Sequence, residues 1–200
     1  MTTTLIQPLP SAVRMPRPWP RLLTVADLAK MPTSLPDGDV RYEPDNGDLV
    51  VLALPGFEHS RRQNKADRYL TVEAELKGLG LSCPEVSVVL RRNPDRVLGP
   101  DVAFLTTDQL PVRLTREGYL ETIPKLVVEI RSKSDTLAEI ESKVAEYLAA
   151  GVVEAWVLDP ENRTIAKHRG DGVVRLATTE WLTSDLLPGF RVAVQLFFAD

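Results

Sequence analysis

The sequence has a single cysteine, Cys83, among its 200 residues, which excludes an intramolecular disulfide and a cysteine-rich zinc site. It has no apolar run near the roughly 18 residues that a membrane-spanning helix needs. Prolines interrupt the short apolar stretch near the N-terminus, so a secretory signal is not indicated. A basic excess is also missing, since the formal net charge is −4. These absences predict a cytoplasmic protein without a membrane partner, and they argue mildly against tight non-specific binding to nucleic acid.

The composition is otherwise that of a globular domain. Hydrophobic residues make up 44% of the chain and charged residues 26%, and this length can bury a core without disulfides. Five prolines lie between Pro8 and Pro20. Because proline lacks a backbone donor and restricts its predecessor, residues 1–20 are expected to form an extended or disordered arm, followed by one domain over 21–200.

Punctuating residues and apolar periodicity predict the order of elements. Asn46-Gly47 favours a tight turn between apolar strands, hence a β-hairpin near the N-terminus. Thr24 is a candidate cap for the first helix, and the long helices end at Gly78 and Gly151. The expected helices are 25–30, 57–77 and 136–150. The expected strands are 85–90, 101–105, 126–131, 154–158, 164–168, 173–177 and 190–198, with a turn at 170–172.

The central order is helix, three strands, helix, strand. A helical crossover favours a parallel pair of strands, whereas the preceding strands can form an antiparallel meander. The sequence therefore predicts an α/β fold with a mixed β-sheet flanked by helices.

Two carboxylates lie on strands expected to be central. Asp101 opens the strand 101–105, and Glu129 interrupts the apolar run of 126–131. Two acids from neighbouring strands that share a notch would repel each other, and this favours a divalent cation such as Mg²⁺ or Mn²⁺. The structural alternatives are that Asp101 caps a turn after Pro100 and that Glu129 pairs with Arg131, which shares its strand face.

Lys143 borders the apolar stripe of the helix 136–150, from which its ammonium could reach the acids. The alternative is a surface pair with Glu139, four residues earlier.

Ordered fragments over most of the chain carry a family resemblance. They are Arg41-Tyr42-Glu43, Pro55-Gly56-Phe57-Glu58-His59, Gly99-Pro100-Asp101-Val102-Ala103-Phe104, Pro124-Lys125-Leu126-Val127-Val128-Glu129-Ile130, Lys143-Val144-Ala145-Glu146-Tyr147 and Asp159-Pro160. Together they resemble the Uma family of restriction-endonuclease-like proteins, which have the PD-(D/E)XK nuclease fold. The resemblance implies a restriction-endonuclease-like fold for this chain.

The resemblance also implies roles for individual residues. Asp101, Glu129 and Lys143 match catalytic positions, and Asp101, Glu129 and the backbone carbonyl of Ile130 match metal ligands. Glu43, His59 and Arg131 match or replace supporting positions. Arg131 stands where many such nucleases have lysine; arginine binds phosphate but stays protonated. The structural alternatives are an exposed acid at the hairpin edge for Glu43 and a bond to neighbouring backbone for His59.

These expectations favour a Mg²⁺- or Mn²⁺-dependent endonuclease that hydrolyses DNA. Two basic groups are candidate contacts to a phosphate backbone, although such groups are more often solvated faces. They are Arg91, Arg92 and Arg96, and Arg61, Arg62, Lys65 and Arg68. One alternative function is an inactive nuclease-fold module that binds proteins or nucleic acid. Another is a structural subunit of a homodimer.

Overall fold

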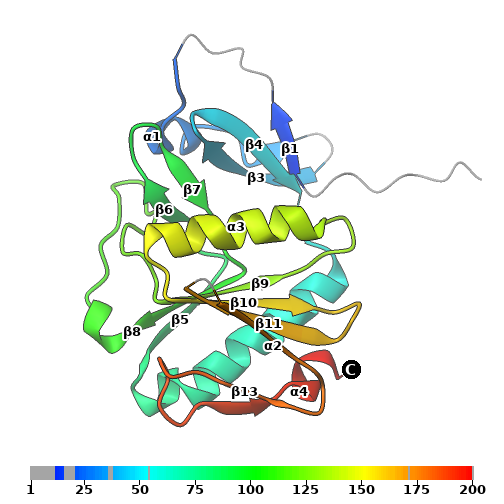
Figure 1. Cartoon of the computed structure of the whole chain (residues 1–200). Coiled ribbons are helices and arrows are strands. Elements are labelled where there is room, and N and C mark those ends of the chain that lie inside the picture. Colours follow the sequence, from blue (N-terminus) through cyan, green and yellow to red (C-terminus); the bar gives the residue numbers. More distant parts are fainter. Residues whose placement is uncertain (1–11, 16–20, 36–37, 54, 171, 200) are drawn as a thin grey trace, which may run out of the picture.

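A computed structural model describes residues 12–15, 21–35, 38–53, 55–170 and 172–199 (Figure 1). Figure 1 shows an N-terminal sheet at one end, helix α3 (Leu137–Ala150) beneath it, and a second, larger sheet on the far side of α3. The two sheets and the helix between them define the space in which the candidate site lies.

The N-terminal sheet is built around the predicted hairpin. Strands β3 (Gly38–Asp45) and β4 (Asp48–Ala53) pair in an antiparallel register that places Asp45 opposite Asp48. Asn46 and Gly47 have φ values of 55° and 83°, as the tight turn requires. The strand order is β1 (Ala12–Met15), β4, β3, β7 (Arg96–Leu98) and β6 (Val88–Arg91), and β2 (Ser34–Leu35) also pairs with β3. The predicted N-terminal β-hairpin is confirmed.

Residues 12–15 fall within the stretch predicted as an arm. In the structure they form β1, which pairs antiparallel with β4. Residues 1–11 and 16–20 lie outside the described residues, so the division into an arm and a domain stays a prediction. The short helix α1 (Val25–Leu28) begins at Thr24, which forms a reciprocal capping box with Asp27.

The larger sheet is mixed, as the sequence predicts. Its order is β12 (Gly172–Leu176), β11 (Thr164–Arg169), β10 (Glu154–Asp159), β9 (Leu126–Ile130), β8 (Val102–Thr106) and β5 (Gly80–Pro84). The pair joined by α3, β9 and β10, is parallel, and the other pairs are antiparallel. The described part of the predicted turn at 170–172 includes Gly170, whose φ is 59°.

The predicted strand 85–90 was placed in the wrong sheet. Its apolar part is β6, which pairs with β7 in the N-terminal sheet, Val88 opposite Leu98. The edge position beside β8 is taken by β5, a strand that the sequence analysis missed because Gly80 and Pro84 are weak strand formers. The prediction that Arg91, Arg92 and Arg96 form one exposed basic group is likewise wrong for Arg96, because Arg96 begins strand β7 and is buried.

Helices cover both faces of the larger sheet. Helix α2 (Phe57–Glu73) contacts β5, β8 and β9, while α3 contacts β10. The short 3₁₀ helix η1 (Glu75–Lys77) extends α2 and ends at Gly78, with φ of 76°; η2 (Thr107–Gln109) follows β8. Helix α3 starts at Thr136, whose side chain accepts a hydrogen bond from the Glu139 N–H, and ends at Gly151, with φ of 110°. The predicted limits of α3 are therefore confirmed.

The C-terminal prediction is only partly right. Strand β14 (Arg191–Ala193) pairs with β13 (Trp181–Thr183), which the sequence analysis missed, and the chain then turns into helix α4 (Gln195–Phe198). Consecutive Phe197 and Phe198 are both buried, which the alternating faces of a half-exposed strand would not permit. Phe197 packs edge-on against Tyr69 of α2, with ring centroids 5.0 Å apart.

Part of the basic group on α2 has a structural role. The Arg62 guanidinium and the Lys65 ammonium both donate to the Ala199 carbonyl, at the end of α4. Arg62 is buried, so the interpretation of 61–68 as one phosphate-binding or solvated face is wrong for this residue.

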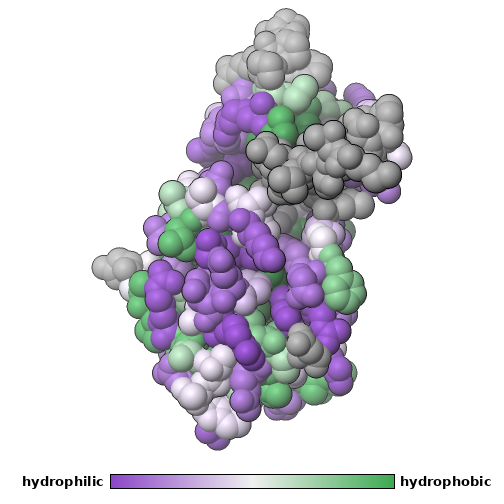
Figure 2. Space-filling model, turned by 90° about the vertical axis from the view of Figure 1, so that its right-hand side faces the viewer, coloured by the Kyte–Doolittle hydropathy of each residue, from purple (hydrophilic) through white to green (hydrophobic). Residues whose placement is uncertain are grey.

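The face in Figure 2 is largely hydrophilic, with apolar side chains in small scattered groups. Within the described ranges, every helix is too short or too polar to cross a membrane.

Candidate functional site

A pocket of about 520 Å³ lies between the N-terminal sheet and the α3 side of the larger sheet. Its lining comes from β1, β3, β4 and β7 on one side, and from α2, β9 and α3 on the other. The predicted residues that line it are Glu43, His59, Asp101, Glu129, Ile130 and Lys143. The fold thus brings six of the seven predicted site residues together; Arg131 is the exception.

Asp101 lies immediately before β8 and is held from two directions. One carboxylate oxygen accepts a hydrogen bond from the Ile130 backbone N–H at 2.6 Å, and the other is 2.8 Å from His59 Nε2. The structural alternative for Asp101 was a cap of the turn after Pro100. The Asp101 carboxylate does accept from a backbone N–H, but that N–H belongs to Ile130 of strand β9. Burial disfavours the His59 imidazolium, yet the hydrogen bond and charge of Asp101 prevail and raise the pKa of His59.

Glu129 is almost fully buried, with an exposed fraction of 4%. Tyr147 Oη donates to Glu129 Oε1 at 2.6 Å, and Lys143 Nζ lies 3.5 Å from Oε2. Burial raises the pKa of Glu129 to about 7, against the opposing effect of the Lys143 charge. The carboxylate is therefore poorly stabilised in its ionised form by the protein alone.

Lys143 reaches Glu129 rather than Glu139, the partner named in the structural alternative. The Glu139 carboxylate instead accepts from the Thr136 N–H at 2.8 Å and closes the start of α3. The Glu129 carboxylate raises the pKa of Lys143, with burial opposing and Glu43 and Asp101 reinforcing the shift. Lys143 therefore carries its positive charge at neutral pH.

Tyr147 is a site residue that the sequence analysis missed. Its ring belongs to the buried stripe of α3, and apolar periodicity alone accounts for it. The available signal was its position four residues after Lys143, since such residues share a helix face. Burial and the neighbouring Glu129 charge raise the pKa of Tyr147 well above its ordinary value, so its hydroxyl stays a donor.

Glu43 is not the exposed hairpin acid that the structural alternative describes. It is 6% exposed, and its Oε1 accepts from the Gly99 N–H at 2.8 Å. Burial raises its pKa, with Lys143 as the main opposing charge. Glu43 thus brings a carboxylate into the pocket from the N-terminal sheet.

Arg131 does not supply a charge to the pocket. Strand β9 ends at Ile130, so the period-two alternation that would align Arg131 with Glu129 stops one residue earlier. The Arg131 guanidinium lies 2.8 Å from Asp159 Oδ2 and donates to the Asp135 carbonyl at 3.4 Å. The alternative pair with Glu129 is therefore wrong, whereas the supporting role of Arg131 stays a prediction.

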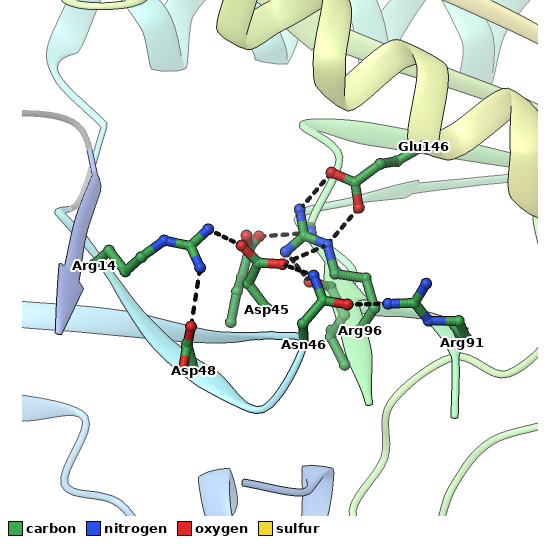
Figure 3. A network of polar contacts seen from close by, with 10 residues as sticks. Arg14, Asp45, Asn46, Asp48, Arg91, Arg96 and Glu146 are labelled. Carbon is green, nitrogen blue, oxygen red and sulfur yellow. Dashed lines mark hydrogen bonds and ion pairs between the residues drawn. The ribbon is translucent and has the colours of Figure 1, made fainter. Parts of the chain in front are cut away.

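A polar network joins the N-terminal sheet to α3 at the rim of the pocket (Figure 3). Arg96 forms a two-point ion pair with Glu146 of α3, at 2.5 and 2.9 Å, and its Nε is 3.7 Å from Asp45. Arg14 of β1 pairs with Asp45 and, at 3.3 Å, with Asp48. Arg91 instead donates to Asn46 at the hairpin turn.

The donor chemistry of the pocket fits Mg²⁺ or Mn²⁺. These ions take oxygen ligands and are often held by one or two carboxylates, with water and substrate phosphate completing the shell. Asp101 and Glu129 supply such carboxylates, and the high pKa of Glu129 marks a buried group that a cation would stabilise. In the described ranges, no group of three or more His, Cys, Asp and Glu side chains is arranged to hold a metal by itself.

The fold is that of a known nuclease-like class. The structure is similar to the crystal structure of "a putative nuclease belonging to DUF820" from Anabaena variabilis, with a TM-score of 0.70 and 15% identity. The similarity covers 88% of this chain and 97% of that chain. The predicted restriction-endonuclease-like, mixed α/β fold class is confirmed.

The family assignment is more specific. Residues 25–195 match the model of the Uma2 family, described as "Putative restriction endonuclease", and the chain belongs to this family. None of the curated proteins matches the chain. The family and the fold together support a nuclease-like function.

Proposed function

We propose that the protein is a Mg²⁺- or Mn²⁺-dependent endonuclease that hydrolyses phosphodiester bonds of DNA. The observation that carries the proposal is the convergence of Asp101, Glu129 and Lys143 in one pocket, with Lys143 Nζ 3.5 Å from Glu129. The family and the similar structure are both described as nucleases, which supports this class of reaction.

Asp101 and Glu129, with the backbone carbonyl of Ile130, are the residues that would hold the ion. When bound, the ion would polarise the scissile phosphate and lower the pKa of a water molecule. Lys143 would orient the attacking water and stabilise negative charge that develops on the phosphate oxygens. His59 and Tyr147 act on the carboxylates rather than on substrate, because each hydrogen-bonds one of them.

A plasmid-nicking assay tests the proposal. Wild type is compared with Glu129→Ala and Lys143→Ala, in Mg²⁺, in Mn²⁺ and in EDTA. We expect metal-dependent nicking by wild type alone, with losses on the order of a hundredfold or more for each variant. Nicking that survives both substitutions would come from a contaminant and would refute the assignment.

An inactive nuclease-fold module that binds proteins or nucleic acid is the second candidate. The arginines of the pocket favour it, because Arg14, Arg41 and Arg96 are each already paired with carboxylates of the protein. The melting temperature in Mn²⁺ distinguishes the two functions. An active site raises it through Asp101 and Glu129, whereas a module without a metal site gives no such response.

A further inference from the structure

The pocket has two walls, the N-terminal sheet on one side and the larger sheet with α3 on the other, and each wall contributes acidic side chains. Glu43 comes from the N-terminal sheet and Glu129 from the larger sheet, and they are only 6% and 4% exposed. The pocket volume of about 520 Å³ falls in the range, about 300–1,000 Å³, that encloses a drug-sized molecule. A single nucleotide is a molecule of that size, so a scissile phosphate can enter with its own sugar and base.

The two walls are tied together. The two-point pair between Arg96 and Glu146 links β7 to α3, and Arg96 is 8% exposed (Figure 3). Planar Arg–carboxylate pairs of this kind are geometrically specific. Separating the walls to admit a wider substrate would therefore break this ion pair, whose carboxylate lies on the same helix as Lys143.

The pocket is acidic. Among the described residues that line it are eight carboxylates, three guanidinium groups, one lysine ammonium and His59, a formal excess of four negative charges with His59 neutral. Duplex DNA carries one charge per roughly 1.7 Å of axis, but a single strand carries one per roughly 3.4 Å. Electrostatic repulsion therefore disfavours a duplex more than a single strand.

An exposed aromatic residue is next to pocket residues in the sequence. Phe57, the first residue of α2, is 76% exposed, next to Gly56 and two residues before His59, both of which line the pocket. Aromatic side chains stack on unpaired bases, but the bases of an intact duplex are covered by their neighbours.

We propose that the pocket takes a single, unpaired DNA strand, one nucleotide of which lies between the two walls while a neighbouring base stacks on Phe57. This inference rests on the proposed DNA hydrolysis and adds the strand state of its substrate. Cleavage is directed to single strands, frayed ends and unpaired segments, and Phe57 contributes to binding rather than to chemistry.

The test uses one labelled oligonucleotide in three forms: alone, annealed to its full complement, and annealed to a complement that leaves an internal segment unpaired. Cleavage in Mn²⁺ is measured by wild type, Phe57→Ala and Phe57→Trp, with Glu129→Ala as the blank. Binding of the same three forms is measured by fluorescence anisotropy in Ca²⁺. Ca²⁺ is used in place of Mn²⁺ because it often supports hydrolysis of this kind poorly, so that the DNA stays intact during the measurement. Variant Leu137→Ala is the matched control, because Leu137 is an exposed apolar residue at the start of the other helix.

We expect wild type to cut the single strand about tenfold or more faster than the duplex, with cuts in the unpaired segment of the third form. Phe57→Ala should raise KM for the single strand on the order of tenfold and leave kcat unchanged, and Phe57→Trp should restore it. Equal or faster cleavage of the duplex overturns the inference and leaves the proposed function intact. Preferential binding of the single strand without any cleavage overturns the proposed function and retains the strand preference. If the protein neither binds nor cleaves any of the three forms, both the inference and the proposed function are overturned.

Discussion

Replacement of Glu129 by glutamine should stabilise the metal-free protein, and the gain should grow with pH. Burial raises the pKa of this carboxyl group from 4.5 to about 7. One pKa unit corresponds to about 1.4 kcal/mol, so the ionised form costs the fold roughly 3 kcal/mol. Since the folded pKa is raised, the stability contributed by the neutral form is complete below about pH 4.5 and is lost as the pH rises through about 7.

Glutamine keeps the shape and the oxygen that accepts from Tyr147, but it carries no charge. The lost attraction to Lys143 reduces the gain, so the net increase in the free energy of unfolding should be about 1–3 kcal/mol near pH 8. Near pH 5 the two proteins should differ little. Urea unfolding followed by circular dichroism, in EDTA at several pH values, measures this difference.

Glu139→Gln is a control with the opposite sign. Hydrogen bonds from Thr136 lower the pKa of Glu139, so its contribution is present at neutral pH and lost as the pH falls through the lowered pKa. This variant should be less stable than wild type at neutral pH, and the deficit should shrink in acid. A Glu129→Gln difference that is flat or negative near pH 8 would refute the reasoning, because the protein would then already compensate the ionised carboxylate.

Three further outcomes follow from the contacts of the site. Tyr147→Phe should lose about 1.5–3 kcal/mol of stability. It should also move the acid limb of the pH profile of cleavage to higher pH, because the hydrogen bond from Tyr147 lowers the pKa of Glu129 and its removal raises that pKa. Tyr42→Phe, which also loses a 2.6 Å hydroxyl bond, should leave the pH profile unchanged. Asp101→Asn should abolish the rise in melting temperature that Mn²⁺ gives wild type, as measured by differential scanning fluorimetry. Arg131→Lys should leave the rate of DNA cleavage within about twofold of wild type, since its ion pair lies outside the pocket; a loss on the order of tenfold would return Arg131 to the site.

The predictable features are those that local chemistry determines. Asn46-Gly47 specifies the hairpin turn because few residues tolerate positive φ, and Thr136 and Gly151 delimit α3 for the same kind of local reason. The location of Asp101 and Glu129 in one pocket was also predictable in outline, because the start of one strand lies beside the end of its antiparallel neighbour.

Other features depend on partners far along the chain. Val88 and Val89 have the composition of a core strand, but pairing with β7 places them in the N-terminal sheet. Arg96, as a charged residue, is expected on the surface from the sequence alone. In the structure its charge is paired with Glu146, fifty residues later, in a half-buried ion pair. The expectation that Arg131 shares the strand face of Glu129 was wrong because strand β9 ends at Ile130, one residue too early for alternation to apply.

One turn of α3 accounts for the arrangement of the site. Lys143 and Tyr147 take opposite oxygens of Glu129, and Glu146 between them holds Arg96 of the N-terminal sheet. Since residues three and four apart share a helix face, one rigid segment sets both the orientation of the candidate metal ligand and the position of the opposite wall. The orientation of the Glu129 carboxylate and the ion pair between the two walls of the pocket therefore depend on the same segment of α3.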